Sequence, residues 1–333
     1  MKNLLAFAFI LLSLRLFALD PIHVQGNSFV NSIGDTIVFR GLNTSDPDKL
    51  EKEGMWTDVY FREIAAWGSN VVRFPVHPQT WRERTPEKYL ELLDAGIELA
   101  KKYDLYVIID WHSIGNLCEI KFQHPMYETT MTETFDFWLT IAERYKDEPA
   151  VAFYELYNEP TVTGEKFGDC SWEKWKEIQR GLIAAVREFD QKAICLVAGF
   201  DWAYDLKPVK DDPIDGENIA YVSHPYPQKR EQPWEAQWEQ DWGFVADKHP
   251  VFLTEIGFCL EDEKGAHIPV ISTKAYGEAI TAYAEKKGIS WVAWVFDTTW
   301  SPMLVSDWDF TPTTQGRFFK EYLQSKLSAN AID

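Results

Sequence analysis

Two glutamates that end apolar segments are the residues of this sequence best placed to do chemistry. Glu159 follows the apolar run that starts at Val151, and Glu255 ends a second run that starts at Val251. A carboxylate at the end of a rigid strand, beside a loop, is well mounted to act as a general acid. Two such groups facing one site predict glycosidic cleavage, in which one protonates the leaving oxygen and the other attacks carbon or activates water. A carboxyl separation of about 5 Å predicts retention of configuration, and about 7 to 9 Å predicts inversion.

Either glutamate alone is equally compatible with a surface ion pair, so their neighbours decide between the two interpretations. Arg73 and Tyr226 follow other apolar runs and are expected to hold Glu255 ionised through charge and hydrogen bonding. The partner's negative charge and partial burial are expected to raise the pKa of Glu159. This division of labour makes Glu255 the nucleophile and Glu159 the acid.

Four further strand-end residues are predicted to contact the sugar. Asn158 is expected to donate to a 2-hydroxyl, and Trp294 to form a floor under the ring. His112 and His224 are expected to bind hydroxyls or to orient the carboxylates. Neither histidine has further ligands at a zinc spacing, and the sequence has no HExxH, P-loop or GxGxxG motif, so we expect no metal and no cofactor. Asp110 is expected to bond barrel backbone or a histidine instead of taking part in the reaction.

Tryptophan is abundant, with 15 residues in 333. Most tryptophans belong to cores, but an excess also suits carbohydrate binding, because the C–H face of a sugar packs flat on an indole. The two best loop candidates for sugar subsites are Trp202 and Trp300. The weaker loop candidates are Trp56, Trp81 and Trp308. Those on helical faces, expected to pack in the core, are Trp67, Trp138 and Trp175.

Strand-like and helix-like segments alternate along the whole chain. The predicted strands are 36–42, 70–76, 105–110, 151–157, 193–198, 218–223, 251–255 and 290–295. The predicted helices are 57–67, 87–102, 132–144, 171–189, 234–248, 273–287 and 315–326. Eight strand–helix units without a linker predict one TIM (β/α)8 barrel, whose function gathers at the carboxyl ends of the strands. A doubly wound open sheet is the alternative, but the chain lacks a glycine-rich phosphate turn.

Three segments outside this alternation have separate predictions. Residues 22–31 and 34–36 are expected to form a hairpin that plugs the bottom of the barrel. The connection after Trp202 is expected to be mostly loop. The acidic and charged stretch at Asp46, Asp48 and 49–53 is interpreted as a solvated surface loop, with a lid as the alternative.

The charge balance limits the partners. Lys+Arg 33 against Asp+Glu 52 gives a formal charge of -19, which repels nucleic acid and anionic membranes. A neutral polysaccharide or oligosaccharide is therefore the expected substrate, and we expect a monomer.

The first residues have the pattern of a secretory signal. Residues 1–18 combine a basic start at Lys2 with an apolar run and a small residue at Ala18, so we expect cleavage there, export, and one catalytic domain over 19–333. No membrane association is expected after cleavage. Export permits disulfides: Cys118 and Cys170 lie in loops after successive strands and are either bridged or free, whereas Cys195 is expected to be a buried thiol.

The motifs RFPV, DWHS, YNEP, HPYP, TEIG and WVAW occur in this order and together resemble glycoside hydrolase family 5, the cellulase family of retaining β-glycosidases. The resemblance covers essentially the whole mature chain. It implies an eight-stranded barrel, retention, no cofactor, Glu159 as acid/base and Glu255 as nucleophile. The other positions that match the family's active-site pattern are Arg73, His112, Asn158, His224, Tyr226 and Trp294.

The expected function is hydrolysis of internal β-1,4 bonds of a β-glucan by double displacement. A β-mannanase, another β-glucan-specific member of the family, and a silent barrel that only binds polysaccharide are the alternatives. A silent barrel is expected to have lost a carboxylate, and both are present.

Overall fold

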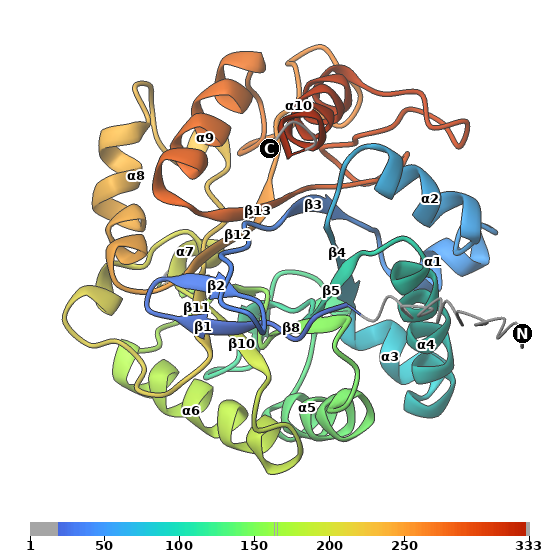
Figure 1. The fold of residues 1–333 in the computed structure, drawn as a ribbon. Coiled ribbons are helices and arrows are strands. Elements are labelled where there is room, and N and C mark those ends of the chain that lie inside the picture. The colour runs from blue at the N-terminus through green and yellow to red at the C-terminus, as the bar shows by residue number, and fades with distance from the viewer. Residues whose placement is uncertain (1–18, 163, 165, 331–333) are drawn as a thin grey trace, which may run out of the picture.

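The computed structural model describes residues 19–330 apart from 163 and 165, so the predicted signal segment lies outside the described residues. Eight parallel strands close into a barrel, and helices surround it (Figure 1). The barrel strands are β3 (Arg40–Asn43), β4 (Val71–Val76), β5 (Tyr106–Trp111), β8 (Val151–Glu155), β10 (Ile194–Ala198), β11 (Ile219–Val222), β12 (Val251–Ile256) and β13 (Ser290–Ala293). The sequence prediction of a TIM barrel is confirmed.

The helices begin and end where local chemistry favours it. They are α1 (Pro47–Lys52), α2 (Asp58–Ala66), α3 (Pro78–Arg84), α4 (Pro86–Lys102), α5 (Met131–Tyr145), α6 (Trp172–Phe189), α7 (Phe200–Ala203), α8 (Glu235–Asp241), α9 (Lys274–Lys287) and α10 (Thr314–Asn330). At the start of α5 the Thr130 hydroxyl accepts from the backbone N–H of Glu133 at 3.1 Å. Gly288 ends α9 with φ 66°, a left-handed conformation that suits glycine. Between β10 and β11 only the short α7 and a 3-10 turn (Lys207–Lys210) form, as expected of a connection that is mostly loop.

A two-stranded hairpin, β1 (His23–Gln25) and β2 (Ser28–Val30), covers the amino-terminal end of the barrel (Figure 1). Phe29 is 3% exposed, and its ring lies 5.1 Å from that of Phe153 and 6.0 Å from that of Phe252. Burying this side chain contributes roughly 1.5–3 kcal/mol. The expected plug is confirmed, and it leaves the opposite end of the barrel for the site.

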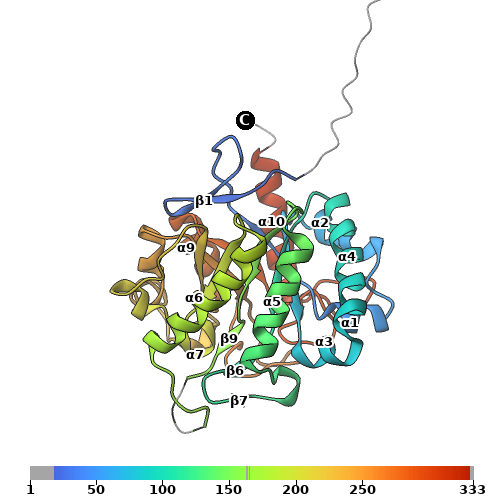
Figure 2. The same cartoon turned by 90° about the horizontal axis from the view of Figure 1, so that it is seen from below.

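At the carboxyl end, a small sheet projects beyond the barrel. It contains β7 (Lys121–Phe122), β6 (Ile114–Asn116) and β9 (Glu159–Pro160), in that order. Figure 2 shows β6 and β7 at the end of the molecule opposite β1. Cys118 and Cys170 are bridged, which joins the loop after β5 to the loop after β8. Cys195 is a buried free thiol, as expected.

The rim beside β3 and β4 is built differently. Helices α1 and α3 begin at Pro47 and Pro78, within a few residues of the strands they follow. The prediction of a solvated loop at Asp46 is wrong: its carboxylate is buried and accepts hydrogen bonds from His77 Nδ1 at 2.8 Å and Tyr89 Oη at 2.7 Å. A capping aspartate and proline start a helix there, which the charge run concealed. No helix among the described residues is long and apolar enough to cross a bilayer.

Candidate active site

Arg73 forms the floor of the site from the middle of β4. The side chain is fully buried, and its Nη1 donates to Glu255 Oε1 and to Asn43 Oδ1, each at 3.0 Å. Its Nη2 donates to Asn158 Oδ1 at 2.7 Å. One guanidinium therefore fixes polar side chains from three other barrel strands or strand ends, as its planar set of donors allows.

Glu155 is the functional residue that sequence reasoning missed. It accepts from Arg73 Nε at 2.6 Å and from Arg73 Nη2 at 3.0 Å, and Thr254 Oγ1 donates to it at 2.8 Å. Burial acts to raise the pKa of Glu155, but the charges of Arg73 and His224 outweigh it and lower the pKa. The sequence did contain a signal for this pair. Glu155 lies in one apolar strand-like run and Arg73 in another, and charged side chains that are buried must pair.

Asp110 and His112 form a second pair beside the arginine. Asp110 Oδ2 lies 2.6 Å from His112 Nδ1 and 3.0 Å from Arg73 Nη2, which confirms its expected bond to a histidine. Burial, aided by the positive charges of neighbouring groups, holds the pKa of His112 well below its usual value. His112 is therefore neutral, and with Nδ1 donating to Asp110 its Nε2 remains an acceptor for a hydroxyl.

The carboxylate of Glu255 has two close partners, both predicted. Tyr226 donates to its Oε2 at 2.8 Å and Arg73 to its Oε1 at 3.0 Å. Both partners lower the pKa of Glu255, as expected, but they do not set the direction of its shift. Burial and the charge of Glu159 raise the pKa of Glu255, against the opposing charges of His224 and Arg73, because the carboxyl is enclosed more deeply than a strand end suggested.

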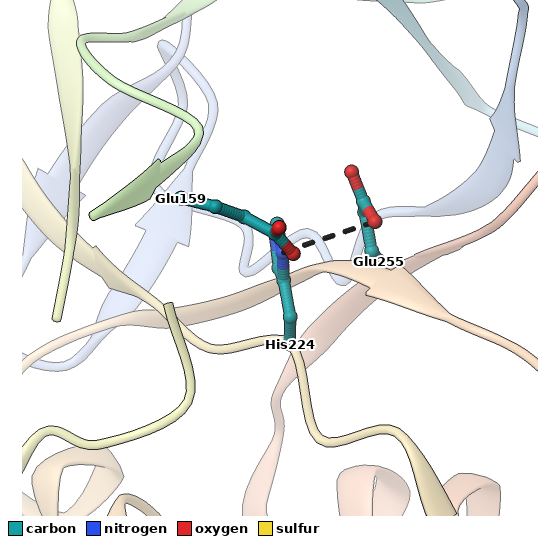
Figure 3. A group of neighbouring side chains, drawn as sticks. All are labelled: Glu159, His224 and Glu255. Carbon is teal, nitrogen blue, oxygen red and sulfur yellow. Dashed lines mark hydrogen bonds and ion pairs between the residues drawn. The ribbon is translucent and has the colours of Figure 1, made fainter. Parts of the chain in front are cut away.

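Glu159 is held by His224, which lies between the two glutamates (Figure 3). His224 Nδ1 is 2.8 Å from Glu159 Oε1 and 3.8 Å from Glu255 Oε2, and its Nε2 is 2.9 Å from Thr254 Oγ1. Burial acts to lower the pKa of His224, but the charge of Glu255 and the bonds to Glu155 and Glu159 raise it to about 9. The imidazole is therefore charged at neutral pH and donates from both nitrogens.

One oxygen of Glu159, one oxygen of Glu255 and a nitrogen of His224 all lie within 4.8 Å of one another. This limit on one oxygen–oxygen distance is compatible with the short carboxyl separation of retaining glycosidases. The same three groups are spaced so that they could ligate a metal. A metal there must displace the proton that His224 holds below about pH 9.

A cleft of about 510 Å³ opens above these groups. The predicted site residues that line it are His112, Glu159, Trp202, Tyr226, Glu255 and Trp294. Arg73, Asn158 and His224 lie beneath it, fully buried. Asn158 Nδ2 is buried without a hydrogen-bond partner, and its bond to a sugar hydroxyl stays a prediction. The Trp294 ring is parallel to that of His112, at 3° and 5.3 Å between centroids.

The other loop tryptophans have different positions. Trp300 does not line the cleft; its ring lies 6.1 Å from that of Trp294 and 5.1 Å from that of His77. Trp81 is buried on α3, and Trp56 packs among core rings with its N–H donated to the Leu92 carbonyl, so the prediction of subsites there is wrong. Trp308 packs partly buried against the same core. The helical tryptophans expected in the core are buried: Trp67, Trp138 and Trp175.

The chain matches the family described as Cellulase (glycosyl hydrolase family 5) over residues 30–299. It belongs to glycoside hydrolase family 5. The family assignment agrees with the barrel and with the placement of Glu159 in β9, just after β8, and of Glu255 in β12.

Relatives in this family include two bacterial endoglucanases. Endoglucanase A of Butyrivibrio fibrisolvens is 27% identical over 252 residues, which is 73% of this chain and 53% of that protein. Endoglucanase C of Evansella cellulosilytica is 30% identical over 226 residues, which is 63% of this chain and 27% of that protein. The chain thus spans about half, or less, of the length of these relatives.

A solved structure is more similar. The β-glucanase SdGluc5_26A from Saccharophagus degradans, in complex with cellotetraose, is 45% identical with a TM-score of 0.91, over 92% of this chain and 94% of that one. The catalytic domain of an endoglucanase from Thermobifida fusca has a TM-score of 0.73 at 20% identity, over 91% and 97% of the two chains, and shares the fold.

Proposed function

We propose that this protein hydrolyses β-1,4-glucosidic bonds of a β-glucan with retention, by double displacement. The observation that carries the proposal is the placement of one oxygen each of Glu159 and Glu255 within 4.8 Å across the cleft. That distance suits direct attack by one carboxylate better than attack by an interposed water. The endoglucanase relatives and the β-glucanase solved with cellotetraose support a glucan as substrate.

In the first step Glu255 attacks the anomeric carbon while Glu159 protonates the leaving oxygen. The C1–O bond to the leaving sugar breaks as the bond from C1 to Glu255 forms. The charge on His224 makes it the proton source in the empty site: its Nδ1–H faces Glu159 Oε1 at 2.8 Å, so Glu159 can pass this proton to the leaving oxygen. Asn158 donates its unpaired N–H to the 2-hydroxyl of the reacting sugar.

In the second step Glu159 takes a proton from water and returns it to His224 Nδ1, and the water oxygen attacks C1 and releases Glu255. Arg73 and Tyr226 stabilise the carboxylate that leaves, because both donate to it in the free site. The oxygen of water thus appears at C1 with the original configuration.

Export and a monomeric state are part of the proposal. The basic and apolar start of the sequence supports export, as does the bridge between Cys118 and Cys170, since disulfides persist in oxidising compartments.

The test is hydrolysis of a panel of soluble β-glucans and β-mannans, with the configuration of the first product followed by proton NMR. We expect the β-anomer from a β-1,4-glucan, and losses on the order of 10⁴-fold in Glu255→Ala and Glu159→Ala. Glu261→Gln is the matched control, because this glutamate lies on the exposed loop after β12. Release of the α-anomer, or activity on mannan alone, contradicts the proposal.

A further inference from the structure

One side of the cleft is bounded by three residues from three different loops that are bonded to one another. Trp202 Nε1 donates to Gln123 Oε1 at 2.7 Å, and Lys229 Nζ lies 4.8 Å from the Trp202 ring centre. Lys229 Nζ also donates to the Asp201 carbonyl at 2.7 Å. All three residues line the cleft, and we call Gln123, Trp202 and Lys229 the leaving-side wall.

The backbone that presents Trp202 is unusual. Asp201, Trp202 and Ala203 have φ of 57°, 55° and 58°, which is a left-handed turn without glycine. Such a turn costs about 1–2 kcal/mol per residue, so it persists only where surrounding contacts impose it. These contacts are present: His224 N donates to the Ala203 carbonyl at 3.1 Å, and Lys229 holds Asp201. The turn therefore places the indole in the cleft at the expense of local stability.

The wall is braced from behind by the loop after β8. The Phe167 ring meets the Trp202 ring edge-on at 5.7 Å, and Asn116 Nδ2 donates to the Phe167 carbonyl at 2.8 Å. The bridge between Cys118 and Cys170 ties the same two loops. These contacts connect the wall to two further loops.

The chemistry identifies which half of a substrate meets this wall. The leaving sugar must lie on the side of the proton donor, Glu159, because that residue protonates its oxygen. Glu159 belongs to β9, which pairs with β6 on one flank and contacts α7, the helix that carries Trp202, on the other. The wall therefore stands around the leaving-group half of the cleft.

The rim beside β3 and β4 is low, whereas the loop after β12 contributes His267, Ile268, Pro269 and Val270 to the cleft lining. Helices α1 and α3 turn away directly at Pro47 and Pro78, and among the described residues none from the loops after β3 and β4 lines the cleft. Figure 2 shows β6 and β7 reaching farther from the barrel than α1 and α3 do. Sugar units on that side have room to continue beyond the cleft.

We propose that the leaving-side wall fixes the number of sugar units accepted on the leaving-group side, so that the cleaved bond is chosen by its distance from the reducing end. Additional units of a longer chain then extend over the low rim beside β3 and β4. This inference rests on the proposed β-glucan hydrolysis and adds the rule by which a bond is selected.

The experiment is digestion of β-1,4-gluco-oligosaccharides of increasing length in oxygen-18 water, analysed by mass spectrometry. Hydrolysis labels the new reducing end, so the labelled fragment shows which bond was broken. For the unmodified protein we expect leaving fragments of constant length while the labelled fragment grows with the substrate. If the leaving fragments lengthen with the substrate, the proposed role of the leaving-side wall is wrong but the proposed hydrolysis is not. If no glucan is cleaved, both proposals are wrong.

Variants of the wall sharpen the test. Trp202→Gly removes the indole and suits the left-handed backbone, and Gln123→Ala removes only the closing hydrogen bond. We expect the rate with longer leaving fragments to rise about tenfold or more, relative to the short one, in Trp202→Gly. Lys121→Ala is the matched control, since this lysine lies exposed on β7 and pairs with Glu119. Unchanged fragments in Trp202→Gly also overturn the proposal.

Discussion

The two glutamates proposed as catalytic, Glu159 and Glu255, have similar burial but different partners. Glu255 is 5% exposed and Glu159 is 8% exposed. Glu255 accepts from Arg73 and Tyr226, whereas the carboxylate of Glu159 is bonded to His224, a group that titrates. Partners and not burial therefore distinguish the group that must attack from the group that must exchange a proton.

The largest expected effect separates the two roles. Glu255→Gln should lower kcat/KM on the order of 10⁴-fold or more on every substrate, because no nucleophile remains. Glu159→Gln should do the same on glucans, but on an aryl glycoside with an acidic phenol the first step needs no proton. A burst of phenol, followed by slow turnover, should then be seen by rapid mixing. Equal losses on the aryl substrate in both variants contradict the assignment.

The next effect concerns Arg73, which donates to Glu255 and has Glu155 as its two-point partner. Glu155→Gln leaves the buried Arg73 without its two-point partner, and should lower the free energy of unfolding by about 3–5 kcal/mol in urea denaturation. Glu285→Gln is the matched control, because its pair with Arg40 is partly exposed and contributes about 1 kcal/mol or less. Similar losses of unfolding free energy in the two variants would show that the buried pair contributes no more stability than the partly exposed one.

The stability of the protein should fall at alkaline pH, because His224, the partner of Glu159, loses its charge there. The folded-state pKa of His224, about 9, is above the unfolded value of 6.5, so the stability from its charge is complete below about pH 6.5 and is lost as pH rises through 9. The loss should reach about 3 kcal/mol, measured as the decrease in unfolding free energy between these limits. His224→Gln should flatten this dependence, and an unchanged slope in that variant argues against a charged imidazole.

The smallest expected effect removes one bond from Glu255. Tyr226→Phe deletes the hydroxyl that donates at 2.8 Å, and should lower kcat about ten- to a hundredfold with little change in KM. Tyr283→Phe removes a comparable bond to Glu239, far from the cleft, and serves as the control for stability and activity. A tyrosine that only packs would leave kcat unchanged.

Much of the site followed from order along the chain. Strand-like runs that contain Arg73, precede Glu159 and end at Glu255 predicted a barrel with these residues toward one end, since the parallel strands of a barrel all point the same way. The predicted bonds from Arg73 and Tyr226 to Glu255 are present. The observed ends of the strands differ from the predicted ends by a few residues, because the hydrogen-bond register of each strand depends on its neighbours.

Other parts could not be read from the chain. Asp46 was taken for a surface residue because its neighbours are charged, yet His77 and Tyr89 enclose it. The raised pKa of Glu255 depends on the depth of the carboxyl and on the charge of Glu159, which together outweigh the charges of His224 and Arg73, and none of these groups is local in sequence.

The sequence by itself determined the barrel and singled out the two acids proposed as catalytic, because periodic burial and strand-end chemistry are local patterns that can be read along the chain. Only the tertiary structure decided that Glu155 neutralises Arg73 and that Gln123, Trp202 and Lys229 close one side of the cleft. Those contacts join side chains from separate loops and strands. Their energies depend on distances of a few ångströms that no spacing along the chain encodes.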